Sequence, residues 1–391
     1  MRAAGLRYPG AAALLILAAV TLLLSPAVLK AEVASSVTIT GYTSVVYSGD
    51  SEDPVAVAAV LKSSLNLNSV GNKNVKGYFQ LDSLIADSFG IDVPRAYLKV
   101  RFPWFRLTLG KTRVSWGDGF VFNAGDVVFD SMGVISGGLS AETLRDETAW
   151  LGAMYLPVGA FSFLEAVIFP HPLPDPEGTF SDDLSDLSNT VSFHELSGGA
   201  RGAFKFGSTT LETGYFASGR EAEHRPYISL HGHLLVDWNL SASMVIPMFN
   251  PQWQQWDEWL AISAGLFHFV NLGGSRSLSF RLEAAIRPGS LWQEATGTAA
   301  LPASDPDAPM YGIYLFPEIA FSPSDTLSLQ LRILVSPVDL SALAMTGVTW
   351  NVYQGLDVFS YLSLMVGDAD DLYNLDSPRS VSWTTGLEFV F

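Results

Sequence analysis

The chain consists largely of short segments in which apolar and polar side chains alternate, and this pattern constrains the fold more than any other feature. Eighteen such segments can be marked between Val37 and Phe391. Side chains on a β-strand point alternately to opposite faces, so each segment predicts a strand with one apolar and one polar face. We therefore expect an all-β protein with few or no helices.

The connections between these segments are sorted by length. Long polar connections follow odd-numbered segments, and the longest span residues 114–147, 170–198, 288–309 and 367–379. Connections after even-numbered segments are mostly brief, as in 103–104, 157–159 and 207–209. Bacterial transmembrane barrels have brief periplasmic turns and longer outer loops, whereas a soluble sandwich has no reason to sort its loops. The sorting predicts a transmembrane antiparallel up-and-down β-barrel with periplasmic termini.

The number of strands is expected to be eighteen, with sixteen as the alternative. The segments at 160–169 and 341–352 alternate irregularly. In the first of them, Glu165 falls in phase with Phe161 and Phe163, which are assigned to the lipid side. We expect a bulge or a shifted strand boundary there. A barrel of this size encloses more space than side chains can fill, so its interior is an aqueous channel or is partly plugged by loops.

The final segment shows the alternation most clearly and ends on a phenylalanine. Trp383, Leu387, Phe389 and Phe391 would face lipid, while the residues between them face a wet interior. A chain that ends this way resembles the outer-membrane proteins of diderm bacteria. The resemblance implies that Phe389 and Phe391 form the signal read by the barrel-assembly machinery, which would then be a partner.

The first residues have the layout of a secretory signal peptide. Arg2 and Arg7 precede an apolar run at 11–24, which is followed by small and polar residues. We expect a signal peptide at 1–31, with cleavage somewhere within 27–34, and a single barrel domain at 32–391. The chain has no cysteine, so a disulfide framework is excluded.

Composition agrees with a membrane barrel and excludes two other classes. Hydrophobic residues make up 48% of the chain and charged residues 16%, against about 25% charged residues in a typical soluble protein. After the expected signal peptide there is no further apolar stretch of the ~20 residues that a membrane helix needs. The formal net charge of −17 disfavours binding to nucleic acid. Outer-membrane lipid is the expected surrounding.

Alternation also assigns side chains to the lumen. On the segment 95–102 the odd positions carry Arg95, Lys99 and Arg101, and the brief turn that follows places Arg106 beside Arg101. The same phase places further basic residues on distant strands: Arg201, Lys205, Arg281 and Arg332. The acids in this phase are fewer than all the lumen bases together: Asp82, Glu212, Glu283 and Glu388. Lumen cations favour anionic solutes. The alternative is that these cations pair with acids across the lumen and make the wall rigid.

One local pattern extends this assignment. Arg95-Ala96-Tyr97-Leu98 is followed by Gly110-Lys111 and then by Trp116-Gly117-Asp118-Gly119-Phe120. This order resembles several families of outer-membrane porins and substrate-specific channels, although Thr112 stands where those families commonly have glutamine. Gly117 and Gly119 allow a sharp bend. We predict that residues 116–120 begin a constricting loop and that residues 121–140 fold into the lumen.

The sequence predicts a channel in the bacterial outer membrane for passive diffusion of small solutes through a water-filled lumen narrowed by an inward loop, with a preference for anions if the lumen cations are unpaired. The alternatives are a transporter of hydrophobic compounds and a surface adhesin or structural barrel with an occluded lumen. No catalytic, metal or cofactor site is expected. His231 and His233 share one face of a strand, but no third ligand is evident nearby. The oligomeric state is left open.

Overall fold

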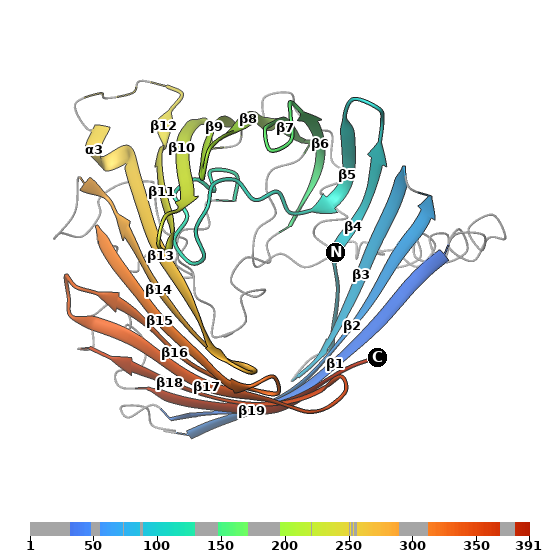
Figure 1. Ribbon diagram of the computed structural model, residues 1–391, viewed down its shortest axis with the longest axis vertical. Coiled ribbons are helices and arrows are strands. Elements are labelled where there is room, and N and C mark those ends of the chain that lie inside the picture. The colour runs from blue at the N-terminus through green and yellow to red at the C-terminus, as the bar shows by residue number, and fades with distance from the viewer. Residues whose placement is uncertain are drawn as a thin grey trace, which may run out of the picture.

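The computed structural model describes residues 32–47, 55–72, 74–86, 89–129, 148–170, 196–219, 221–249, 251, 253, 256–288, 312–367 and 380–391. The expected signal peptide at 1–31 lies outside these residues. The described strands form one antiparallel sheet that curves round to meet itself (Figure 1). Within the described residues, no helix is long and apolar enough to cross a membrane.

The strands follow one another round the barrel in chain order. The first nine are β1 Glu32–Tyr47, β2 Val55–Asn72, β3 Val75–Ile85, β4 Phe89–Arg101, β5 Arg106–Thr112, β6 Ala149–Pro157, β7 Phe163–Phe169, β8 Ser197–Phe206 and β9 Thr209–Ser218. The others are β10 Glu223–His233, β11 Asp237–Met244, β12 Ile246–Pro247, β13 Leu260–Gly273, β14 Arg276–Ile286, β15 Ile313–Ser324, β16 Leu327–Ser336, β17 Ser341–Tyr353, β18 Leu356–Val366 and β19 Val381–Val390. A single turn of helix, α3 Trp256–Trp259, precedes β13.

The sheet closes between its first and last strands. β1 pairs with β2 on one side and with β19 on the other, from Thr38 opposite Val390 to Tyr47 opposite Val381. β12 continues β11 after an interruption at Val245, so the 19 segments make 18 barrel strands. This confirms the predicted fold and strand number. Closure gives every strand two neighbours, which satisfies its backbone hydrogen bonds without water.

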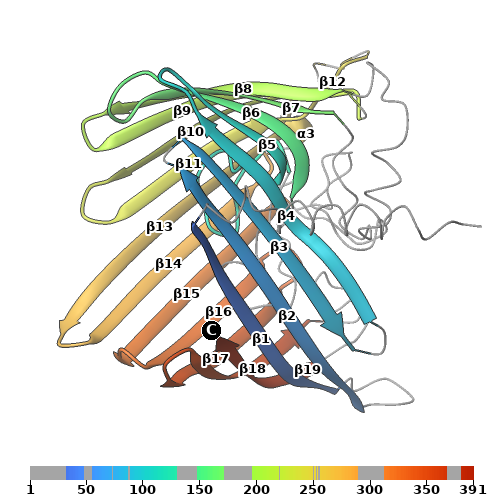
Figure 2. The same ribbon diagram turned by 90° about the vertical axis from the view of Figure 1, so that its right-hand side faces the viewer.

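The two ends of the barrel differ in their connections (Figure 2). Tight turns join β4 to β5, β8 to β9 and β17 to β18, whereas the long connections at 113–148 and 287–312 leave the opposite end. Gly207 and Gly355 adopt positive φ angles of 62° and 76° in two of the tight turns, a conformation that favours glycine. The connections therefore follow the sorting expected from the sequence.

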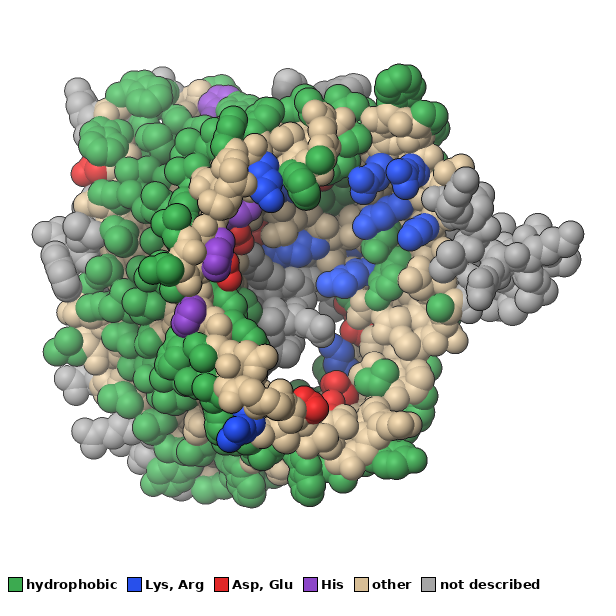
Figure 3. Space-filling model, in the orientation of Figure 1, with side chains coloured by type: hydrophobic (Ala, Val, Ile, Leu, Met, Phe, Trp, Pro, Cys, Tyr) green, Lys and Arg blue, Asp and Glu red, His purple; other side chains and the backbone are tan. Residues whose placement is uncertain are grey.

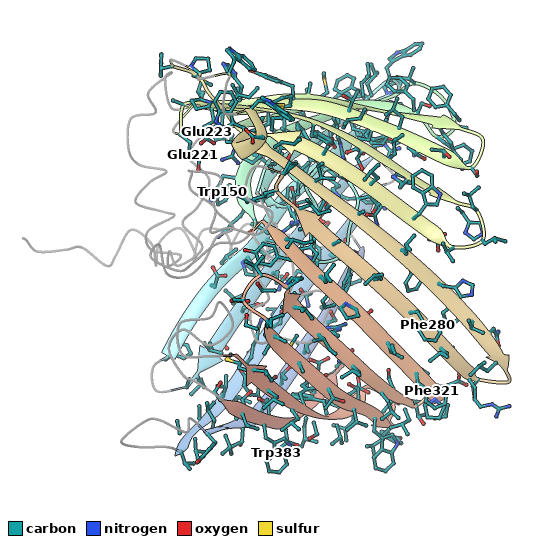
Figure 4. The ribbon with its side chains drawn as sticks, turned by 90° about the vertical axis from the view of Figure 1, so that its left-hand side faces the viewer. Trp150, Glu221, Glu223, Phe280, Phe321 and Trp383 are labelled. Carbon is teal, nitrogen blue, oxygen red and sulfur yellow. The ribbon has the colours of Figure 1, made fainter. Side chains whose placement is uncertain are left out.

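The outer surface of the barrel is apolar. Phe280, Phe321 and Trp383 point away from the interior (Figure 4). Val57 and Trp104 are 65% and 79% exposed. Large apolar side chains that face outward along the barrel would be costly to expose to water and are stable in a hydrocarbon layer.

One strand has the opposite phase from the one expected. β7 begins at Phe163, after a turn that contains Phe161, so the strand boundary is later than the sequence suggested. The inward-facing residues of β7 are Phe163, Glu165, Val167 and Phe169, while Leu164 and Ile168 are exposed on the outside. The prediction that Phe163 faces lipid is wrong. Glu165 instead forms an ion pair with Arg201 inside the barrel at 2.7 Å.

Candidate functional site

A segment that lies inside the barrel dominates the interior. After β5 the chain leaves the wall and crosses the interior before it returns to β6 (Figure 1). We call residues 114–129 the inward segment. Its side chains Trp116, Phe122 and Val128 are at most 1% exposed. Residues 130–140, which were also expected to fold inward, lie outside the described residues.

A single carboxylate on the barrel wall holds the middle of the inward segment. Glu283 of β14 accepts hydrogen bonds from the backbone N–H groups of Phe120 at 2.7 Å, Val121 at 2.7 Å and Phe122 at 3.0 Å. Glu283 is 3% exposed. Hydrogen bonds to a charged acceptor are stronger than neutral ones, and these three also satisfy N–H groups that would otherwise be buried without partners.

A second group of wall residues holds the start of the inward segment. Glu212 of β9 accepts a hydrogen bond from the Gly117 N–H at 2.7 Å. Arg201 of β8 donates to the Ser115 carbonyl at 2.8 Å and pairs with Glu165 and Glu212 at 2.7 and 3.1 Å. These charges satisfy one another as they fix the segment, so Arg201 contributes to the position of the backbone.

The bend of the inward segment depends on close backbone approach. Gly117 has a φ of 68°, and a Cβ built on it would lie 2.6 Å from the Cα of Gly125. Asn123 fixes this bend because its side chain donates to the Trp116 carbonyl at 2.8 Å and accepts from the Gly125 N–H at 3.1 Å. Ser263 of β13 accepts a hydrogen bond from the Ala124 N–H at 2.9 Å.

Apolar packing completes the attachment on both sides of the bend. One cluster joins Val121, Phe122 and Ala124 to inward-facing residues of β14 to β17: Ala285, Tyr314, Phe316, Leu334, Leu343 and Met345. The other joins Val114, Trp116, Val127 and Val128 to inward-facing residues of β6, β7, β9 and β10: Ala149, Leu151, Ala153, Val167, Phe169, Phe216 and Tyr227. The inward segment therefore packs against two parts of the wall, β6 to β10 and β14 to β17.

Two of the predicted lumen cations belong to this packed side. Arg332 pairs with Glu318 at 2.5 Å, and Arg281 lies 3.7 Å from the same carboxylate. Both guanidinium groups rest on the ring of Phe120, at 5.5 and 3.6 Å from its centroid. These contacts match the alternative in which lumen cations pair with acids.

Replacing Glu318 with glutamine is expected to destabilise the barrel. The side chains of Glu318 and Arg332 are both 8% exposed, so the substitution removes a negative charge that pairs with a buried guanidinium group. We expect a loss of about 3 kcal/mol in the free energy of unfolding, measured by urea titration in detergent or lipid.

The matched control is Asp82→Asn. Its partner Lys62 is 50% exposed, and such pairs contribute roughly 0–1 kcal/mol. Equal losses in the two variants would show that the Glu318 pair is no more important than a solvated one.

The opposite wall carries cations of another kind. Lys76, Lys99, Arg101 and Arg106 on β3 to β5 are exposed and, among the described residues, have no carboxylate within ion-pair distance. Lys99 lies opposite Lys76, and Arg101 lies opposite Arg106. Lys and Arg side chains gather on this side of the opening (Figure 3). Arg95 is half-buried on the same strand, opposite Gln80.

Alternation in the sequence had already assigned Glu212 and Glu283 to the interior, but not their contacts. Glu165 and Glu318 were missed. Glu165 fell in phase with residues assigned to lipid, which predicted a bulge or a shifted strand boundary but no lumen contact, and Glu318 follows Pro317 in a strand whose alternation is otherwise apolar. His231 faces the inward segment, with its Nδ1 3.2 Å from an oxygen of Asp118. Within the described part of the chain, no three His, Asp or Glu side chains are placed to hold a metal ion.

Comparison with known proteins shows similarity of fold. No family model and no curated protein matches the chain. Among solved structures, Pseudomonas aeruginosa OccK11 (OpdR) has a TM-score of 0.57 at 10% identity, over 92% of this chain and 96% of that one. Pseudomonas aeruginosa OccK2 (OpdF), solved in complex with glucuronate, has a TM-score of 0.55 at 12% identity, over 92% and 96%. Acinetobacter baumannii OccAB3 has a TM-score of 0.55 at 8% identity, over 92% and 99%.

Proposed function

We propose that this protein is an outer-membrane channel through which small anionic solutes diffuse passively. One observation carries the proposal: the inward segment is bonded to the wall between β6 and β17, and the wall left open carries Lys76, Lys99, Arg101 and Arg106, which pair with no carboxylate of the described residues. The attached segment narrows the lumen, and this narrowing needs no conformational change. Solutes would then pass between the segment and the wall formed by β1 to β5.

The preference for anions rests on the contrast between the two walls. On the packed side, Arg201 and Arg332 are neutralised by buried carboxylates. On the open side, Lys99, Arg101 and Arg106 keep their charge and remain exposed. Rings or rows of such cations lower the energy of an anion in the pore and raise that of a cation. The glucuronate complex of the similar OccK2 structure supports a small carboxylate as the solute.

Location in the outer membrane is supported by the closed sheet and its apolar exterior. Lipid would then be the immediate partner of the outer face. Phe389 and Phe391 lie at the end of β19 with ring centroids 4.5 Å apart, and Phe391 is 60% exposed. Their exposure suits the proposed role of these rings as the signal for barrel assembly.

The test is reconstitution of the purified protein into planar bilayers and liposomes. We expect stepwise ion conductance with a reversal potential that favours anions under a salt gradient. Liposomes should swell faster in glucuronate than in glucose, because the two differ mainly by the carboxylate. A barrel that gives no conductance steps would instead be an adhesin or structural barrel, and equal swelling would contradict the preference for anions.

A further inference from the structure

Two of the four cations on the open wall rest on aromatic rings: Lys99 on Tyr97 and Arg106 on Tyr155. The Cζ of Arg106 lies 4.7 Å from the centroid of the Tyr155 ring. Tyr155 stacks on Phe163, with centroids 4.8 Å apart and an interplanar angle of 28°. The other neighbour of Phe163 is Arg201, whose Cζ lies 5.2 Å from its centroid. Four side chains from β5, β6, β7 and β8 thus form one continuous column.

The two ends of this column differ in freedom. Arg201 has a side chain that is 12% exposed, and two carboxylates and a backbone carbonyl hold it. Arg106 is exposed, and no carboxylate of the described residues pairs with it. Arg201 is held in place, and two rigid rings stack between Arg201 and Arg106. The column therefore restricts the position of Arg106.

A ring face holds a guanidinium group without using its N–H donors. A carboxylate partner would occupy those donors and cancel the charge, whereas a cation–π contact leaves the N–H donors and the positive charge available to a solute. A stacked guanidinium group can then present its planar fork to a passing carboxylate. An Arg side chain that rests on no ring is more flexible, so it would lose more conformational entropy when it bound the same carboxylate.

We propose that Tyr155 and Phe163 are positioning residues that hold Arg106 as a carboxylate-binding subsite in the lumen. This inference rests on the proposed channel function and adds to it the residues that determine solute preference. The subsite takes a small carboxylate through two parallel N–H···O bonds. Arg106 makes the contact, and the two rings act through Arg106 alone.

The experiment compares Tyr155→Leu with Tyr155→Phe. Leucine removes the ring face, whereas phenylalanine keeps the face and loses only the hydroxyl group. We expect Tyr155→Leu to lower the permeability of acetate and glucuronate relative to sodium about two- to five-fold, the factor that corresponds to an exposed cation–π contact. Tyr155→Phe should retain the wild-type ratio, since a role confined to the ring face does not need the hydroxyl group.

Phe359→Leu is the matched control for a wider lumen. Phe359 lies on the interior face of β18, where it stacks on Tyr361, and among the described residues no Lys or Arg lies over its ring. It should raise conductance slightly and leave the carboxylate preference unchanged. If Tyr155→Leu does not assemble into a heat-modifiable barrel, Phe163→Leu tests the same column.

The outcomes separate this inference from the proposed function. A wild-type channel with no preference for anions would refute the proposed function itself. An anion-selective wild type whose ratio survives Tyr155→Leu, or falls equally in Phe359→Leu, would overturn the positioning role of Tyr155. Loss in Tyr155→Leu together with rescue in Tyr155→Phe supports it.

Discussion

Replacing Glu283 with alanine is expected to raise the single-channel conductance and the open-channel noise more than any other single substitution in the lumen. Its carboxylate accepts three backbone hydrogen bonds from the inward segment. At roughly 1.5–3 kcal/mol for each bond to a charged group, the loss of three bonds disfavours the attached segment by about 4.5 kcal/mol or more. That change shifts the ratio of attached to detached segment about a thousand-fold or more.

Glutamine at position 283 should give an intermediate result. Its amide oxygen can still accept from Val121 and Phe122, but its NH₂ group would face the Phe120 N–H, where a donor meets a donor. Conductance is measured in planar bilayers at 1 M salt, where surface charge has little effect. The control is Glu388→Gln, which removes a lumen carboxylate that accepts a hydrogen bond from Thr40 and, among the described residues, forms no hydrogen bond or ion pair with the inward segment. Unaltered conductance in Glu283→Ala would show that the segment does not narrow the pore.

Replacing both Arg101 and Arg106 with glutamate is expected to reverse the ion preference of the channel. The two residues lie opposite each other on neighbouring strands, and the substitutions change the local charge by four units. Reversal potentials under a salt gradient should change sign. The effect should be large at 0.1 M salt and small at 1 M, because the Debye length falls from about 10 Å to about 3 Å.

Arg276→Glu controls for the change in net charge. Arg276 lies at the turn between β13 and β14, in the same end of the barrel as Arg101, but on the outward phase of its strand. It should leave the reversal potential close to that of the wild type. If the double variant keeps its preference for anions, the open wall formed by β3 to β5 does not line the conducting path.

Alternation and loop lengths were enough to predict the barrel and its strand number, because both depend on the local pattern of each segment. Where a turn was longer than expected, alternation assigned the residues of the next strand to the wrong face of the sheet. At β7, Phe161 lies in the turn 158–162 and so gives no phase for the strand, which begins at Phe163 with Phe163 and Glu165 facing inward. A shift of one residue exchanges every inward and outward side chain of a strand.

The candidate site could be predicted only in part. The lumen phase of Lys99, Arg101 and Arg281 follows from alternation, but their partners depend on the sheet register and on the path of the inward segment. Glu318 meets Arg332 because β15 and β16 are paired at that level. Glu283 meets Phe120 across 163 residues of sequence, which no local pattern encodes. The sequence left open whether the cations are free or paired, and the two walls give different answers.

The seam between β1 and β19 joins residues almost a whole chain apart, since the hydroxyl group of Thr40 bonds to Glu388 across 348 positions. Contacts of such sequence separation form late, because a long stretch of chain has to be ordered first. Until then, the growing sheet has two open edges whose backbone amides cannot be solvated by hydrocarbon. Pairing of β19 with β1 therefore has to accompany insertion into the bilayer, or another strand has to pair with these edges until β19 reaches β1.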